Sequence, residues 1–69
     1  MKVRNRLAEI MKETKTTQRQ LADALNISKT TINTYAQNKN RTYNNEIVEA
    51  ICQYFGIRVE DFFYSEYEP

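Results

Sequence analysis

The sequence predicts a compact all-α protein of five short helices. In successive segments, apolar residues recur at intervals of three and four, the spacing that places them on one face of a helix. Residues that begin or end helices separate these segments, and no stretch alternates apolar and polar residues as a half-buried strand does. A chain of 69 residues has room for one hydrophobic core. We therefore expect a single domain over residues 1–69, with its core within 3–63 and a short tail at 64–69.

Two helices are predicted in the first part of the chain. The first spans about residues 2–15, and the second begins at Thr17, where Gln20 completes the pattern of a capping box. The second helix ends near Leu25, and Asn26 suits the left-handed backbone that often follows a helix. The apolar residues expected on the inner face of the first helix are Val3, Leu7, Ile10 and Met11.

The third predicted helix begins at its cap, Ser28, and runs to about Gln37. Because so few residues separate it from Leu25, the second and third helices must cross at a large angle, as in a helix-turn-helix. Short threonine and asparagine side chains occupy its polar face, at a cost in helix propensity. This composition favours a binding surface. A solvated helix face is the alternative.

Residues 38–44 form a polar loop, and the fourth helix follows from a cap at Asn44 or Asn45 to Gly56. A final turn or two then completes the core. Ile57 and Val59 lead into this turn, which contains Phe62 and Phe63. The apolar residues expected to face inward from the fourth helix are Ile47, Val48, Ile51, Cys52 and Phe55.

Charge is divided unevenly between the two parts of the chain. Residues 1–45 carry nine Lys and Arg against three Asp and Glu, a net charge of +6. Residues 46–69 carry one Arg against six Asp and Glu, a net charge of −5. A basic part that contains the polar helix suggests a polyanionic partner, and an acidic part suggests a surface that avoids one. An unevenly charged solvated surface is the alternative.

Several classes of function are not expected. The chain has no histidine, no glycine-rich phosphate loop and too little mass to form a cleft, so we expect no enzyme, no cofactor, no metal site and no small-molecule ligand. No apolar run is long enough to cross a membrane, and no signal peptide is evident, which predicts a cytoplasmic protein without a membrane partner. The single cysteine, Cys52, lies on an apolar helical face, which favours a buried small residue over a reactive thiol.

Two stretches, "TQRQLADALNISKTTINTYAQNK" and "IVEAICQYFGIRVEDFF", resemble the lambda-repressor and Cro-like (XRE-family) helix-turn-helix DNA-binding domains. The resemblance extends from about Arg6 to Phe63. Its most specific parts are Gln18 with Leu21-Ala22, then Ile27-Ser28 and Ile32, and later Phe55-Gly56-Ile57 before Asp61-Phe62-Phe63.

The resemblance implies double-stranded DNA as the partner, with residues of about 28–37 forming a recognition helix in the major groove. By position, the residues that would face bases are Lys29, Thr30 and Thr34, with Asn33 beside them. The residues that would contact the DNA backbone are Thr17, Gln18, Arg19 and Ser28, and, in the loop, Lys39, Asn40 and Arg41.

The sequence departs from the family pattern in several places. The usual proline is absent from the loop before the fourth helix, and that loop is one residue longer. Met11 and Ala36 stand where the family usually has a paired arginine and glutamate, so both charges are missing together. Asn38 replaces the usual glycine but tolerates the same left-handed backbone. Arg58 stands where a serine or threonine cap is common.

The function predicted is a sequence-specific transcription regulator, a repressor that binds a palindromic operator as a homodimer. The alternative is a helical protein-interaction module, such as an adaptor, an anti-repressor or an antitoxin-like partner, that retains the fold. Aromatic residues crowd the C-terminus and predict a dimer interface, unless their rings fold back on the first and fourth helices. These residues are Phe62, Phe63, Tyr64 and Tyr67.

Overall fold

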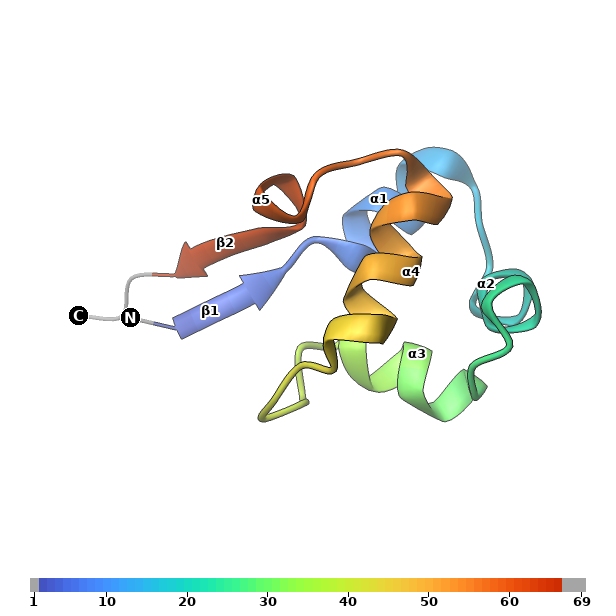
Figure 1. The fold of residues 1–69 in the computed structure, drawn as a ribbon, viewed down its shortest axis with the longest axis horizontal. Helices are drawn as coiled ribbons and strands as arrows, with labels where there is room; N and C mark the ends of the chain where they lie inside the picture. The colour runs from blue at the N-terminus through green and yellow to red at the C-terminus, as the bar shows by residue number, and fades with distance from the viewer. Residues whose placement is uncertain (1, 67–69) are drawn as a thin grey trace.

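The computed structural model describes residues 2–66, which form five helices and a two-stranded sheet (Figure 1). Strand β1 and helices α1 and α2 are followed by α3, which lies across one end of the longer helix α4. A single turn, α5, and strand β2 complete the described chain. The bounds are β1 Lys2–Asn5, α1 Leu7–Thr14, α2 Gln18–Leu25, α3 Lys29–Ala36, α4 Asn45–Phe55, α5 Val59–Phe62 and β2 Phe63–Glu66.

The sheet corrects the prediction of an all-α fold. The strands pair antiparallel and form a ribbon on one side of the helices, with Arg4 opposite Tyr64 and Asn5 opposite Phe63 (Figure 1). Helix α1 therefore begins at Leu7 and not near residue 2. Val3, expected in the core, is 62% exposed.

Asn5 is the physical reason that α1 begins so late. Its Oδ1 accepts a 3.0 Å hydrogen bond from the backbone N–H of Leu7, which satisfies a donor that the helix itself leaves unpaired. The N–H of Arg6 donates to the carbonyl oxygen of Phe62 at 2.8 Å, so the chain enters the helix alongside the end of α5. Residues 2–5 then meet β2 and exchange ladder bonds with it.

The remaining helix boundaries confirm the capping predictions. Thr17 and Gln20 form the expected capping box at α2, and the side chain of Ser28 accepts from the backbone of Thr31 at α3. At α4 the cap is Asn44, whose Oδ1 accepts from two backbone N–H groups. Left-handed backbone ends α2 at Asn26 (φ 55°) and α4 at Gly56 (φ 67°), and Asn38 also has a positive φ of 57°.

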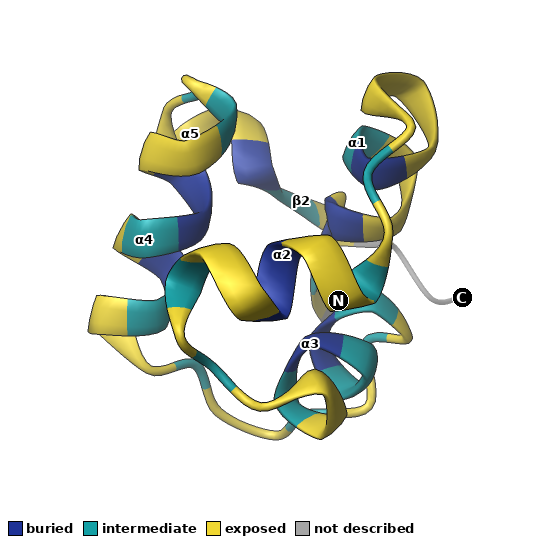
Figure 2. Cartoon of the chain, turned by 90° about the vertical axis from the view of Figure 1, so that its right-hand side faces the viewer, coloured by how far each residue is buried: buried dark blue, intermediate teal, exposed yellow. Residues whose placement is uncertain are grey.

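Each of the five helices contributes one fully buried side chain to a common core (Figure 2). Burial of these groups is the main favourable term in folding, about 1.5–3 kcal/mol for each large apolar side chain. The five residues are Leu7, Leu21, Ile32, Ile51 and Phe62; Met11, Ala22, Tyr35, Val48 and Cys52 pack around them.

Cys52 lies within this core, as predicted. Burial raises the pKa of its thiol above the usual 9.0, because an apolar environment disfavours the thiolate. The cysteine therefore acts as a small apolar side chain. No helix in the part of the chain that the structure describes is long and apolar enough to cross a membrane.

Candidate nucleic-acid interface

Helix α3 presents a polar face to solvent because its opposite face is fixed in the core. Ile32 is fully buried and Tyr35 nearly so. Around the rest of the helix, Lys29 and Thr30 are exposed, whereas Asn33 and Thr34 are half-buried. The structure thus places all four predicted base-facing residues outside the core, on one helix that cannot rotate without unpacking it.

Helix α2 contributes to the same surface. Gln18, Lys29, Thr30 and Asn33 line a shallow hollow of about 220 Å³ between the two helices of the motif. Gln18 Nε2 donates a 3.0 Å hydrogen bond to Asn33 Oδ1, which also accepts from Gln37 Nε2 at 3.1 Å. Both bonds hold the oxygen of the Asn33 amide.

The same bonds limit what Asn33 and Thr34 can offer to a base. A bidentate pair with adenine needs the Asn33 Oδ1 as an acceptor, so at least one glutamine must first release it. The hydroxyl of Thr34 donates to the backbone oxygen of Thr30 at 2.9 Å. Its hydrogen is therefore used within the helix, and its methyl group is the part suited to an apolar contact with thymine.

The predicted backbone-contacting residues fall into two groups. Thr17, Gln18 and Arg19 begin α2, where the first peptide N–H groups have no acceptor within the helix and favour an anion. Ser28 lies at the start of α3, where its hydroxyl caps the helix and bonds to the Thr31 hydroxyl at 2.8 Å. The second group, Lys39, Asn40 and Arg41, belongs to the loop that follows α3.

The loop after α3 is anchored at its beginning by Asn5, a residue that no sequence pattern singles out. Asn5 is polar but buried, with only 3% of its surface exposed. Its backbone N–H donates to Asn38 Oδ1 at 2.8 Å, and Asn38 Nδ2 donates to the Asn5 backbone oxygen at 3.3 Å. Asn5 Nδ2 also donates to the backbone oxygen of Tyr35 at 2.9 Å. Strand β1 is therefore bonded to the C-terminal end of α3.

Two tyrosines anchor the far end of the loop. The Tyr35 hydroxyl accepts a 3.0 Å hydrogen bond from the backbone N–H of Asn44. The Tyr43 hydroxyl accepts from Asn5 Nδ2 at 3.1 Å, and its ring packs edge-on against Tyr35 and Phe63, with centroids 5.3 Å and 4.8 Å away. Both ends of the loop are thus held, so Lys39 and Arg41 project from a defined position.

The structure separates the four residues predicted for a dimer interface. Phe62 is fully buried, and Phe63 packs against the core, as the fold-back alternative requires. Tyr64 is half-buried, with the guanidinium of Arg6 4.7 Å from its ring centroid. Tyr67 lies outside the described residues. Nowhere in residues 2–66 do three His, Cys, Asp or Glu side chains gather as metal ligands.

The comparisons with known proteins agree with this geometry. The family model described as a Cro/C1-type helix-turn-helix DNA-binding domain matches residues 6–68. A crystal structure of a Bacteroides fragilis protein, provisionally described as DNA-binding, superposes with a TM-score of 0.81 at 19% identity. The match covers 91% of this chain and 100% of that one, and at this identity it shows a shared fold. No curated protein matches the sequence.

Proposed function

Because the chain belongs to the family of Cro/C1-type helix-turn-helix DNA-binding domains, we propose that it is a sequence-specific transcription regulator that acts as a repressor. The observation that carries this proposal is the polar face of α3, held outward while Ile32 and Tyr35 bury its other face. In this proposal α3 enters the major groove, where each base pair presents a distinct pattern of donors, acceptors and methyl groups.

Four side chains of α3 would read bases. Lys29, exposed at the start of the helix, has the reach and the donors for guanine O6 and N7. The methyl groups of Thr30 and Thr34 would pack on thymine. Asn33 would bind adenine after one of its glutamine partners turns away, so its contribution depends on Gln18 and Gln37.

The residues around α3 would hold the protein on the DNA backbone. The start of α2 would receive one phosphate at Thr17, Gln18 and Arg19. The loop would contact another through Lys39, Asn40 and Arg41, with Ser28 close to the backbone at the start of α3. Such contacts set position and orientation without distinguishing sequences.

We propose further that two copies bind a palindromic operator. In a two-fold dimer of helix-turn-helix domains, the recognition helices lie one DNA turn apart, about 34 Å, which sets half-site centres about ten base pairs apart. Phe62 is unavailable to a partner because the core covers it. Tyr64 on the ribbon and Tyr67 beyond it are therefore the residues that we assign to the interface.

Selection of binding sites from random duplex DNA tests the proposal. We expect enrichment of an inverted repeat with that spacing, and binding that weakens steeply as salt increases. Two results together would contradict the proposal: no sequence is enriched, and any binding to DNA does not depend on salt. The protein-interaction module would then be the better description.

A further inference from the structure

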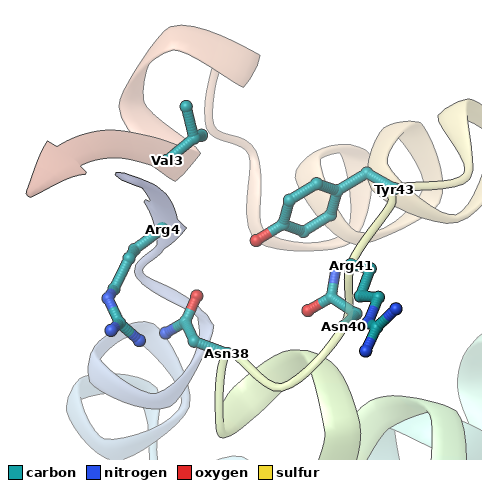
Figure 3. A pocket seen from close by; sticks show the side chains of 6 residues that line it. All are labelled: Val3, Arg4, Asn38, Asn40, Arg41 and Tyr43. Carbon is teal, nitrogen blue, oxygen red and sulfur yellow. The ribbon is translucent and has the colours of Figure 1, made fainter. Parts of the chain in front are cut away.

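A second hollow lies between strand β1 and the loop that follows α3 (Figure 3). Its volume is about 310 Å³. Figure 3 shows Arg4 and Arg41 on opposite sides of it, with the amide side chains of Asn38 and Asn40 between them. Two of the six lining residues are arginines and none is acidic: Val3, Arg4, Asn38, Asn40, Arg41 and Tyr43.

The fold brings the two arginines together from distant parts of the sequence. Arg4 belongs to β1, where it is paired with Tyr64 on β2. The reciprocal hydrogen bonds between its neighbour Asn5 and Asn38 fix β1 against the start of the loop. Arg41 follows three residues after Asn38 in that loop. The hollow is therefore built on fixed backbone.

We propose that this hollow binds a phosphate group of the DNA backbone, with Arg4 and Arg41 as its cations. The proposal rests on the proposed DNA-binding function and adds strand β1 to the DNA-binding surface. A guanidinium presents planar pairs of N–H donors that match phosphate oxygens. Two of them around a hollow with no acidic lining residue favour an anion over any neutral ligand.

The other polar groups of the hollow suit the same ligand. The Tyr43 hydroxyl oxygen accepts from Asn5 Nδ2, so its hydrogen is directed elsewhere and can donate to a phosphate oxygen. Asn40 Oδ1 is buried and accepts no hydrogen bond within residues 2–66. A guanidinium that donates both to this oxygen and to a phosphate would satisfy it.

The position of the hollow identifies where on the DNA this phosphate would lie. Gln18, at the start of α2, bonds to Asn33 midway along α3. The hollow lies at the loop that follows Ala36, the last residue of α3. Of the two ribbon strands, β1 is the one nearer to that loop (Figure 1). The phosphate it binds would therefore lie on the C-terminal side of α3, away from the one at the start of α2.

Salt-dependent binding to a mixed-sequence duplex tests the site, because phosphate contacts need no particular sequence. Removing one phosphate contact from B-DNA should reduce the slope of log K against log salt by about 0.9. We expect Arg4→Gln to show this reduction and to weaken binding several-fold on every sequence, and Arg41→Gln to do the same. Arg4→Lys, which keeps the charge, should retain the slope.

Arg58→Gln is the matched control, since it removes the same charge in the connection between α4 and α5, at the end of α4 opposite α3 (Figure 1). Its ion pair with Glu60 is exposed, so its loss should change stability little. Thermal unfolding of each variant identifies any loss of folding. If Arg4→Gln does not fold, Arg4→Lys is compared with Arg4→Met instead. We then expect the salt slope of Arg4→Met to be smaller than that of Arg4→Lys by the same amount.

Duplexes with single neutral methylphosphonate linkages locate the contact. A methylphosphonate at one position should weaken wild-type binding and leave Arg4→Gln binding unchanged, because that variant has already lost the contact.

Three results would contradict the proposals. If the wild-type protein binds DNA but Arg4→Gln and Arg58→Gln have equal salt slopes, the phosphate site alone is overturned. A wild-type protein without salt-dependent DNA binding overturns the proposed function itself. Chemical-shift changes at Asn38 and Asn40 with inorganic phosphate, with no effect of Arg4→Gln on DNA binding, would assign the hollow to a free anion and overturn the DNA contact.

Discussion

Asn5 and Asn38 bond to each other in both directions, the N–H of Asn5 to Asn38 Oδ1 at 2.8 Å and Asn38 Nδ2 to the oxygen of Asn5 at 3.3 Å. The pair joins β1 to the residue that follows α3 with left-handed backbone. Family members usually have a glycine where Asn38 stands. Here the asparagine adopts the same backbone conformation and adds a side chain that holds β1.

Replacing Asn5 should destabilise the protein more than any other asparagine. Asn5→Ala removes the acceptor of the Leu7 N–H and the donor to the Tyr43 hydroxyl, and it leaves the Tyr35 oxygen with only the N–H of Asn38 as a donor. A buried group left unsatisfied costs about 1–3 kcal/mol, so we expect a loss of at least that size in urea unfolding. Asn45→Ala, at the exposed start of α4, should cost less than about 0.5 kcal/mol. Equal losses would show that the Asn5 bonds contribute nothing specific.

Met11 and Ala36 are expected to lie against each other, with an apolar contact in place of the family's charged pair. Met11 is buried and Ala36 packs against the core. Introducing one charge by Ala36→Glu should lower the free energy of unfolding more than the double variant Met11→Arg with Ala36→Glu, in which the charges are paired. A double variant no more stable than the single one would mean that the two positions do not touch.

Gln18 and Asn33 should act as one unit in binding. Because Gln18 Nε2 bonds to Asn33 Oδ1, Gln18→Ala removes the proposed phosphate contact and also one of the two hydrogen bonds to the Asn33 amide oxygen. Operator affinities of both single variants and the double variant should therefore be non-additive, with a coupling energy above about 0.5 kcal/mol. Gln20→Ala, at the same helix terminus but bonded to Thr17, is the comparison. Strict additivity between Gln18 and Asn33 would contradict a shared role.

Tyr64 tests the dimer separately from folding. Its contact with Arg6 is partly exposed and worth about 0.5–1 kcal/mol, so Tyr64→Ala should leave a folded protein. Combined with Tyr67→Ala, it should shift sedimentation toward the monomer and weaken operator binding. Tyr54→Phe, on an exposed part of α4, should change neither. Unchanged association in the double variant would exclude the ribbon end as the interface.

Helix boundaries were predictable because the residues that set them act on neighbours a few positions away. Thr17 with Gln20, Ser28, Asn44 and Gly56 each determine one helix end through bonds or backbone conformation within the same turn. The inward faces of α2, α3 and α4 followed from apolar spacing in the same way, because that spacing is also local.

The ribbon was not predictable from such patterns. The four-residue spacing between Val3 and Leu7 fits a helix, but the backbone of residues 2–5 pairs with residues 63–66 at the other end of the chain. A local sequence pattern carries no information about a pairing strand so far away in the chain. The roles of Asn5 and Tyr43 depend on that pairing, so the anchored loop and the hollow beside Arg4 became visible only with the fold.

If the outer face of α3 reads base pairs, as we propose, substitutions on that face must change the base preference of the protein. Site selection with Lys29→Ala and Thr34→Ala should relax preference at particular positions, with about 1–3 kcal/mol lost for each direct contact. Lys39→Ala should instead weaken all sequences alike and reduce the salt slope. Folded Lys29→Ala and Thr34→Ala variants that keep the wild-type affinity and base preference would show that α3 is not the reading surface.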